Sequence, residues 1–271
     1  MKNISVLLFL LITLALNAQN NKTSGLNARQ FHKYWKVESE SPDYKVTFLG
    51  DTVEILSPKG LTLWRKEKMS GKVTIEYDAC VVVEVEGDRL SDLNCFWMAS
   101  DPQYPDNIWK REKWRSGIFL NCYSLQLYYM GYGGNHNSTT RFRRYDGNEA
   151  AITNAKARPA ILKEYTDADH LLEANKWYHI KITNENNRVS YYINGVRLVD
   201  FRDADPLTEG WFGFRTTLSR TRIANFHYEC SPQEISEIPL HWIGDTPQQD
   251  RTVSLGVPFS EGELYPENTL Q

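Results

Sequence analysis

Long apolar segments, clustered cysteines and an excess of charge of either sign are all scarce in this chain of 271 residues. Beyond residue 16 no apolar run is long enough to span a membrane, so we expect no membrane association of the mature protein. The formal net charge is -3, whereas general binding to nucleic acid needs a broadly basic surface, so this partner is excluded. The cysteines form no CxxC pair, which argues against a structural zinc site.

Cysteine usage leaves two interpretations open. The chain has four cysteines in all, and each of them lies in an apolar, strand-like context: Cys80, Cys95, Cys122 and Cys230. In an exported protein such residues are either buried thiols or partners in one disulfide. The spacing of the four residues does not choose between these interpretations.

The first 18 residues predict a secretory signal peptide. Lys2 precedes an apolar run from residue 6 to residue 16, and small residues around Ala18 offer a cleavage position before Gln19. The apolar run is too short for a stable membrane span, and no cysteine follows it that could carry a lipoprotein anchor. We therefore expect an exported protein of the periplasm or the extracellular space.

Apolar and polar residues alternate with a period of two through most of the remaining chain. The expected strands are residues 46–49, 53–56, 72–85, 94–99, 117–130, 177–183, 188–193, 196–201, 210–216 and 222–228. Hairpin turns are expected at residues 50–51, 186–187 and 194–195, where Gly or Asn tolerates positive φ, while residues 150–175 look irregular or partly helical. Many strands joined by short turns predict an all-β protein, a β-sandwich or jelly roll of two antiparallel sheets.

One segment differs in composition from the strands around it. Residues 128–145 read YYMGYGGNHNSTTRFRRY and combine aromatic rings, glycines, amides, hydroxyls and three arginines with no acidic residue. Neither a hydrophobic core nor a solvated loop uses this mixture. Aromatic rings beside forked donors suit a ligand with flat apolar faces, many hydroxyls and a carboxylate. The segment therefore indicates a sugar chain that bears uronic acid.

The closing strands carry a family resemblance. The run KWYHIKITNENNRVSYYINGVRLVDF, followed by GWFGFRTTLSRTRIANFHYE, resembles the end of a concanavalin-like lectin/glucanase jelly roll. The middle segments NCFWMASDP and SGIFLNCYSLQLYYMGYGGNHNSTTRFRRYDG resemble a narrower group of secreted domains, found among saccharide-degrading proteins of gut and environmental Bacteroidetes. The resemblance covers roughly residues 31 to 230, and it implies a jelly-roll domain over residues 19–230.

The tail differs from the rest of the chain. Residues 231–247 are proline-punctuated and read as a linker. The run RTVSLGVPFSEGELYP after it resembles the opening strand of the N-terminal β-domain of exo-acting rhamnogalacturonan lyase-like proteins. Residues 231–271 are therefore expected either to pack on the sandwich or to be a linker with the truncated start of a second β-domain.

Strand alternation predicts which side chains of the arginine-rich segment share a face. A concave glycan cleft is expected to be lined by Gln126, Tyr128, Tyr132, Arg141, Arg143 and Tyr145. The alternative is structural, with the arginines paired to Asp101, Asp146 or Glu149 and the tyrosines capping the sheet.

Cleavage of a uronate by β-elimination needs a group that neutralises the carboxylate, a base and an acid. Arg143, with Arg141 beside it, is expected to bind the carboxylate through paired hydrogen bonds. Tyr128, Tyr132 or Tyr145 is the candidate base or acid, because an arginine stabilises a phenolate, and His136 is the other candidate base, because histidine titrates near neutral pH.

Further substrate contacts are expected from amide, charged or stacking side chains near the cleft. They are Asn94, Trp97, Asp101, Gln126, Tyr132, Asn135, Asn137, Arg141 and Arg215. We expect no cofactor. Structural calcium at Asp101, Asp106 and Asp203 is left open, although no loop has the dense alternating carboxylates that such a site uses.

The catalytic motifs of the related enzymes are missing. Laminarinase-like enzymes carry E-x-D-x-x-E, whereas Glu76-Tyr77-Asp78 lacks the third carboxylate. Jelly-roll alginate lyases carry Q-x-H, and here Tyr128 stands where the histidine would be. The leading hypothesis is an exported carbohydrate-active protein that cleaves an acidic, pectin-type glycan by β-elimination. The alternatives are a non-catalytic carbohydrate-binding module of a larger enzyme and elimination or hydrolysis of 3-keto-glycosides. The oligomeric state does not follow from the sequence.

Overall fold

The computed structural model describes residues 24–232. The predicted signal peptide and nearly all of the predicted linker and second domain lie outside these residues. Within them, none of the helices is long and apolar enough to cross a membrane. Cys80, Cys95 and Cys122 are buried and form no disulfide, in agreement with the interpretation as buried thiols, whereas Cys230 is exposed and so differs from it.

Short helices and strands follow one another in an order dominated by β-structure. The strands are β1 (Trp35–Ser39), β2 (Lys45–Leu49), β3 (Thr52–Arg65), β4 (Met69–Ser70), β5 (Lys72–Val82), β6 (Leu93–Ser100), β7 (Gln126–Gly133), β8 (Thr139–Asp146), β9 (Lys163–Tyr165), β10 (Trp177–Glu185), β11 (Arg188–Ile193), β12 (Val196–Arg202) and β13 (Glu209–Ser231). The α-helical turns are α2 (Phe31–Tyr34), α3 (Glu112–Arg115), α4 (Gly134–Asn137) and α5 (Ala150–Thr153). The 3₁₀ turns are η1 (Ile108–Arg111), η2 (Phe119–Ser124), η3 (Ala155–Ala157) and η4 (Ala168–His170).

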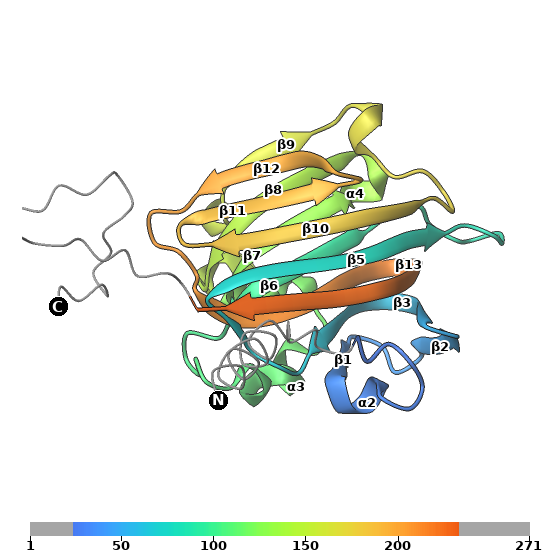
Figure 1. The fold of residues 1–271 in the computed structure, drawn as a ribbon, viewed down its shortest axis with the longest axis horizontal. Helices are drawn as coiled ribbons and strands as arrows, with labels where there is room; N and C mark the ends of the chain where they lie inside the picture. The colour runs from blue at the N-terminus through green and yellow to red at the C-terminus, as the bar shows by residue number, and fades with distance from the viewer. Residues whose placement is uncertain (1–23, 233–271) are drawn as a thin grey trace, which may run out of the picture.

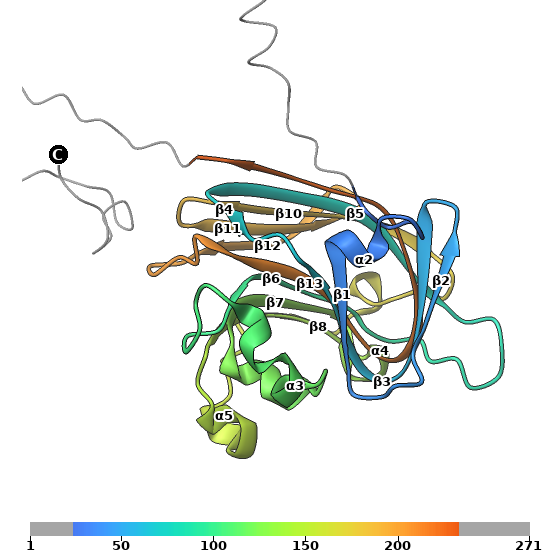
Figure 2. The same ribbon diagram turned by 90° about the horizontal axis from the view of Figure 1, so that it is seen from below.

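The strands form two antiparallel layers packed face to face (Figures 1 and 2). The first layer runs β12-β11-β10-β5-β13, and the second runs β13-β6-β7-β8-β9. The predicted hairpin turns are confirmed, because β10 pairs with β11 around residues 186–187 and β11 pairs with β12 around residues 194–195. The predicted all-β sandwich is therefore correct, and β9 is a strand within the region expected to be irregular.

β13 belongs to both layers. Its first part pairs with β6 from Trp211 to Arg215, and its second part pairs with β5 from Arg220 to Ser231. The register shifts between Thr217 and Ser219, and Leu218 between them has a left-handed backbone with φ of 51°. A bulge of this kind bends a strand and lets it change sheets. The sequence predicted two separate strands here, 210–216 and 222–228, and they are one bent strand instead.

Apolar side chains from the inner faces of both layers fill the space between them. Trp97 of β6 stacks on Phe142 of β8 with ring centroids 6.0 Å apart, and on Tyr191 of β11 at 6.3 Å. Tyr128 is fully buried in the same cluster. This core takes up most of the aromatic residues that sequence reasoning assigned to ligand binding.

The outer face of β6, β7 and β8 is covered in part by the segment from residue 101 to residue 125 (Figure 2). A second apolar cluster lies beneath this cover and includes Trp64, Phe96, Leu127 and Tyr145. The strand expected at residues 117–130 is wrong in its first half, because Phe119–Ser124 forms η2 and β7 begins only at Gln126.

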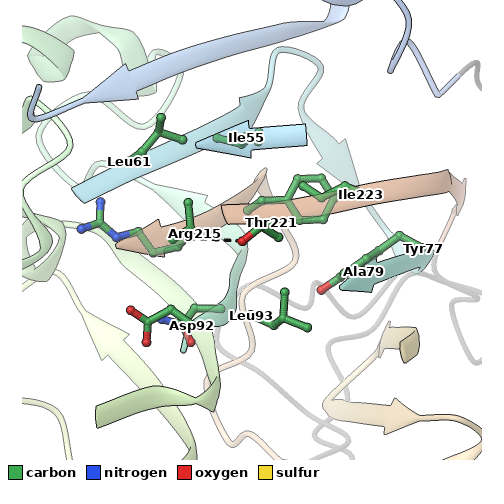
Figure 3. Close-up of a pocket in the computed structure, with 12 residues that line it drawn as sticks. Ile55, Leu61, Tyr77, Ala79, Asp92, Leu93, Arg215, Thr221 and Ile223 are labelled. Carbon is green, nitrogen blue, oxygen red and sulfur yellow. Dashed lines mark hydrogen bonds between the residues drawn. The ribbon is translucent and has the colours of Figure 1, made fainter. Parts of the chain in front are cut away.

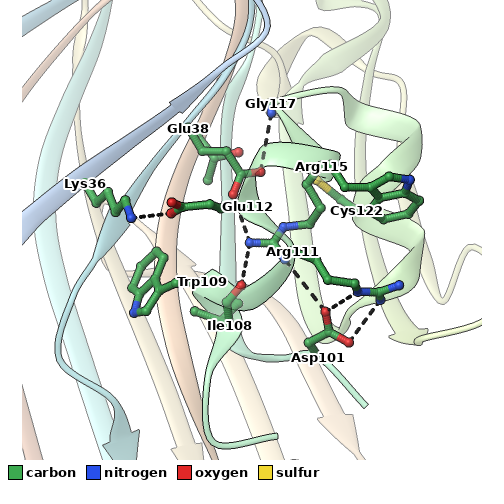
Figure 4. Close-up of polar contacts among 12 residues, drawn as sticks. Lys36, Glu38, Asp101, Ile108, Trp109, Arg111, Glu112, Arg115, Gly117 and Cys122 are labelled. Atoms are coloured by element: carbon green, nitrogen blue, oxygen red, sulfur yellow. Dashed lines mark hydrogen bonds and ion pairs between the residues drawn. The ribbon is translucent and has the colours of Figure 1, made fainter. Parts of the chain in front are cut away.

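A buried ion pair attaches the cover to the sandwich, and further ion pairs lie within the cover itself (Figure 4). Arg115 donates to Glu38 of β1 at 2.9 Å and lies 3.8 Å from Asp101. Arg111 donates to both oxygens of Asp101, at 2.7 and 3.0 Å. Burial raises the pKa of the Glu38 carboxyl above its usual range, although Arg115 acts in the opposite direction. The cover is thus held by charge as well as by apolar contact.

Candidate functional site

Three hollows in the described part of the chain were compared as ligand sites. An internal cavity of about 20 Å³ lies between the layers, with Asp92 and Arg215 at one end and Tyr77 and Ile223 at the other (Figure 3). It has room for about one water molecule and none for a sugar. A second hollow lies between residues 27–30 and the turn after β2, and Arg29 is the charged side chain in its lining. The third is a cleft of about 430 Å³ that concentrates arginines and aromatic rings.

We call this third hollow the arginine cleft. It lies on the outer face of β6, β7 and β8, next to η2. Its lining consists of Arg89, Asp92, Asn94, Phe119, Tyr123, Tyr129, Gly131, Gly134, Asn135, His136, Thr139, Arg141, Arg143, Tyr145, Arg158 and Thr217. Ligand sites of sugar-binding size are concave and combine apolar walls with a few convergent polar groups, and the arginine cleft has this composition.

Strand register explains the position of the arginines. In an antiparallel pair, residues directly opposite one another point to the same face. Gly131 lies opposite both Asn94 of β6 and Arg141 of β8, so these three residues form one row across the sheet. Tyr129 lies opposite Arg143 in the next row. The floor of the cleft therefore has a glycine at its centre and polar side chains on both sides.

The prediction of which β7 side chains share a face with Arg141 and Arg143 was wrong by one residue. Tyr128 lies opposite Arg144, and both lie on the face away from Arg141 and Arg143. The Tyr128 hydroxyl donates to Asp203 at 2.6 Å and accepts from the Leu207 amide, inside the sandwich. Tyr132 shares this inner face, is buried, and donates to the Leu171 carbonyl at 3.1 Å. Tyr129, which sequence reasoning did not select, occupies the place in the cleft.

Several other expected contacts lie outside the arginine cleft. Trp97 is fully buried in the core, and Asp101 is buried beneath the cover in its ion pairs with Arg111. The Arg215 guanidinium donates to the Gly117 carbonyl at 2.5 Å and so holds the cover. The remaining two are Gln126, which begins β7 at the far end of the strand, and Asn137, whose amide is bonded to the backbone of Leu172.

The cleft brings together six of the predicted residues: Asn94, Asn135, His136, Arg141, Arg143 and Tyr145. Asn135 and His136 belong to α4, where three successive residues have left-handed φ values of 58°, 60° and 57°. Such a backbone costs free energy in non-glycine residues and is often found at functional sites. His136 is exposed at the rim.

The arginines of the cleft differ in how far they are already paired. Arg141 donates to Glu164 of β9 at 2.5 Å, which is a partner that the sequence did not suggest. Arg143 donates to the carbonyl of Pro159, and Arg158 lies over the Tyr123 ring with its guanidinium carbon 5.8 Å from the centroid. Within residues 24–232, no carboxylate forms an ion pair with Arg143 or Arg158. Both retain donors for an anionic ligand.

Four aromatic rings form one wall of the cleft. Tyr145 lies 5.0 Å from Tyr123 and 5.7 Å from Tyr129, measured between ring centroids, and Phe119 lies 5.7 Å from Tyr129. Two of the rings come from the cover and two from the sheet. Because the cover is attached by Arg115, the shape of this wall depends on the ion pairs described above.

Three buried polar atoms of the cleft residues have no hydrogen-bond partner within the described protein: Tyr145 Oη, Asn94 Oδ1 and Arg89 Nε. Buried polar atoms are almost always paired in folded proteins, so such atoms at a cleft suit a ligand or bound water. Burial raises the pKa of the Tyr145 hydroxyl well above its usual range, and Arg143 offsets this only in part. The expectation that arginine would stabilise a Tyr145 phenolate is therefore not supported, because burial dominates.

Sequence reasoning missed three charged residues of the cleft. Arg89 and Asp92 precede β6 in a loop, and Arg158 lies in the irregular region after α5. None belongs to a strand, so alternation could not assign them to a face. The aspartates left open as calcium ligands form no metal-binding group within residues 24–232, since Asp203 pairs with Arg144 at 2.7 Å and Asp101 pairs with Arg111.

Comparison with known protein families identifies the family of the chain. Residues 55–226 match a family described as Domain of unknown function (DUF6250). The chain belongs to this family. The matched residues run from β3 to β13 and so contain the cover and most of the arginine cleft. No curated protein sequence matches the chain.

Solved structures similar to this DUF6250 domain share the fold. A protein of unknown function with a galectin-like fold from Bacillus subtilis has a TM-score of 0.60 at 15% identity, over 78% of this chain and 95% of that chain. The exoplasmic/lumenal domain of VIP36, in its Ca²⁺/Man-bound form, has a TM-score of 0.54 at 8% identity, over 82% and 93%. The metal-free carbohydrate recognition domain of Emp46p has a TM-score of 0.52 at 13% identity, over 77% and 95%. The DUF6250 domain is thus a galectin-like, concanavalin-like β-sandwich.

Proposed function

We propose that this DUF6250 domain binds an acidic carbohydrate in the arginine cleft. The observation that carries the proposal is Arg143, a half-buried arginine with a carbonyl as its hydrogen-bond partner, which faces a wall of aromatic rings. Aromatic faces suit the apolar faces of sugar rings, and guanidinium groups bind carboxylates through paired hydrogen bonds. The carbohydrate recognition domain among the structures of the same fold supports a sugar as ligand.

Calorimetric titration with a panel of oligosaccharides tests the proposal. Uronate oligosaccharides of pectic, alginate and glycosaminoglycan type are compared with neutral oligosaccharides of equal length. We expect binding of at least one uronate and none of the neutral sugars. Arg143→Gln should weaken binding by about 1.5–3 kcal/mol, the usual contribution of a hydrogen bond to a charged group. Absence of binding across the uronates would refute the proposal.

Arg188→Gln is the matched control for the titration. Arg188 is an exposed arginine of β11 that pairs with Asp200 at 2.6 Å, in the other layer of the sandwich. The two variants remove the same charge, so a general electrostatic attraction would weaken equally in both. A loss confined to Arg143→Gln assigns the binding to the cleft.

β-Elimination at a bound uronate is the second candidate function. The unpartnered, buried hydroxyl of Tyr145 lies in the same cleft as Arg143 and favours it. Burial raises the pKa of Tyr145 above its ordinary value, so the hydroxyl keeps its proton at neutral pH, as an ordinary tyrosine also does; this argues against a base role and leaves it the role of a proton donor to the leaving oxygen. His136 at the rim is the candidate base.

The ultraviolet absorbance of a newly formed unsaturated uronate tests this second candidate. An absorbance rise with the wild-type protein, lost in Tyr145→Phe at unchanged affinity, would establish elimination. A flat trace with the same ligands that bind in the titration would show a binding module without lyase activity. The 3-keto-glycoside alternative would require turnover of a substrate that has no carboxylate, and Arg143→Gln would then leave turnover unchanged.

We also propose that the protein acts after export, in the periplasm or outside the cell. The basis is the signal-like sequence of residues 1–18 alone. Fractionation of expressing cells tests it, with mass spectrometry of the mature N-terminus. A protein that remains in the cytoplasm with Met1 or Lys2 intact would contradict the proposal.

A further inference from the structure

The end of the arginine cleft nearest the start of β6 has its own chemistry. Asp92 is 7% exposed and has a left-handed backbone with φ of 74°. Its carboxylate accepts from the Ser91 hydroxyl at 2.8 Å and lies 3.8 Å from Arg89. Arg89 in turn donates to the Thr217 carbonyl at 3.1 Å and to Ser91 at 3.3 Å. Asp92 is therefore fixed in place, in a conformation that most residues avoid.

Acceptor atoms dominate at this end. Asn94 follows two residues after Asp92 and leaves Oδ1 buried without a partner. A carboxylate oxygen and an amide oxygen side by side accept hydrogen bonds from hydroxyl groups. The same pair repels a second anion, because the nearby guanidinium groups are already committed, Arg89 to Ser91, Thr217 and Asp92, and Arg215 to the Gly117 carbonyl.

Donor atoms dominate at the opposite end. Arg143 and Arg158 lie there, and Arg141 lies between the ends with Glu164 as its partner. Asp92 and Arg143 lie four residues apart along the strands and two strands apart across the sheet. This register gives a Cα separation on the order of 15 Å. The side chains of both residues extend toward each other, and the distance that remains between them fits one or two linked sugar rings.

A glycine between the two ends makes room for the Tyr129 ring. Gly131 lies between Asn94 and Arg141 in the register, and a Cβ atom there would stand 2.4 Å from the Tyr129 hydroxyl oxygen. Any side chain would fill the floor and displace Tyr129. The Tyr129 ring therefore lies over the glycine and forms the floor between the two ends, and a flat sugar ring can stack on it and reach both ends of the cleft.

We propose that the arginine cleft recognises a uronate in one orientation, with its carboxylate at Arg143 and neutral hydroxyl groups at Asp92 and Asn94. This inference rests on the proposed function and specifies its ligand class. The ligand has a single anionic group within the recognised unit, and a sugar with sulfate on the hydroxyl-bearing ring is rejected by Asp92. Asp92 and Asn94 are specificity-determining residues in this scheme.

Titration of oligogalacturonate and its chemically O-sulfated derivative tests the orientation, with chondroitin and chondroitin sulfate as a second matched pair. The wild-type protein should bind an unsulfated member at least tenfold more tightly than its sulfated partner, since like charges brought together in an interface oppose binding. Asp92→Asn should reduce this preference to within about threefold, because asparagine tolerates the left-handed backbone and removes the charge. Asn94→Asp adds a charge at the same end and should increase the preference.

The outcomes separate this inference from the proposed function. If the wild-type protein binds no uronate, sulfated or unsulfated, the proposed function fails and the orientation fails with it. If it binds a sulfated member as tightly as its unsulfated partner or more tightly, only the orientation is overturned. If it binds an unsulfated uronate and Asp92→Asn and Asn94→Asp both leave the preference unchanged, only the orientation is overturned. Thermal melting of each variant provides the folding control. Asp92→Asn removes a negative charge from this end of the cleft and Asn94→Asp adds one. If one variant fails to fold, the other still tests the orientation.

Discussion

At the scale of single residues, burial separates the tyrosines of this domain into two groups. Tyr128 and Tyr129 are neighbours in the chain, yet one ties the core together and the other lines the arginine cleft. Tyr128 bridges β7 to the connection between β12 and β13, because its hydroxyl contacts both Asp203 and the Leu207 amide. Its contribution is therefore to stability.

Tyr128→Phe should lower the free energy of unfolding by about 1–3 kcal/mol, because the buried Leu207 amide would lose its acceptor. Urea denaturation followed by tryptophan fluorescence measures this change. Affinity for a uronate ligand should stay within about twofold of the wild-type value, since the hydroxyl faces away from the cleft. A large loss of affinity with little change in stability would instead place Tyr128 at the ligand.

Sequence reasoning recovered Arg141, Arg143 and Tyr145 of the site on β8 but chose the wrong tyrosines of β7, for a physical reason. β7 is covered on both faces, so its residues after Gln126 are all buried and show no polar alternation. Its register against β8 is set by the left-handed turn of α4, which follows no simple hairpin rule. A shift of one residue then exchanges Tyr128 for Tyr129. The hairpins around β11 were predictable because Asn-Asn and Asn-Gly fix their turns.

At the scale of elements, β13 is the strand on which the two layers meet. Leu218 at its bend combines a left-handed backbone with 52% exposure. A left-handed conformation costs a side-chain-bearing residue about 1–2 kcal/mol, and glycine avoids this cost. Leucine is thus not the residue that stabilises the protein most at this bend.

Leu218→Gly should raise the free energy of unfolding by up to about 1 kcal/mol, after the entropy cost of about 0.5–1 kcal/mol that glycine brings. Leu49→Gly is the matched control, because Leu49 is a similarly exposed leucine at the end of β2. The control should lose stability. Chemical denaturation of both variants measures the effect, and a loss of stability in Leu218→Gly equal to that of the control would contradict the prediction.

β5 carries a charged row on the outer face of the first layer. Lys181 donates to Glu76 at 2.8 Å and holds the pKa of that carboxyl below its ordinary value of 4.5, with smaller contributions from His227 and His179. Because the folded pKa is the lower one, the stabilisation is complete above pH 4.5 and is lost as the pH falls through the folded value.

Glu76→Gln should therefore be less stable than the wild type near pH 7 and equally stable in strong acid. The difference should be small, about 0.2–1 kcal/mol, since the pair is partly exposed and screened by solvent. Thermal denaturation across a pH series measures it. A difference that grew as the pH fell would contradict the assignment of the lowered pKa to Glu76.

At the scale of the whole molecule, the cover joins the N-terminal strand to the ligand site. Arg115 connects Glu38 of β1 with the segment that supplies Phe119 and Tyr123 to the cleft wall. None of this was predictable from the sequence, because the ion pairs join residues far apart in the chain and the segment was expected to be a strand. The sandwich itself was predictable from its period of two.

Arg115→Met should lower the free energy of unfolding by about 3–5 kcal/mol, because it leaves Glu38 buried without its cation. The double variant Glu38→Gln/Arg115→Met should recover part of the loss. Calorimetric melting measures both. Equal losses in the single and double variants would show that the contribution of Arg115 comes from packing and not from its charge.

The place of β13 in the chain has a consequence for biosynthesis. Residues 209–231 are the last strand of the domain to leave the ribosome, and both layers need it as a hydrogen-bonded neighbour. Until then β5 and β6 have no common partner, and contacts between distant parts of a chain form slowly. We therefore expect the nascent polypeptide to stay open until nearly the whole domain has been synthesised. A nonsense mutation before residue 209 would leave two half-sandwiches with unpaired edges, prone to aggregation.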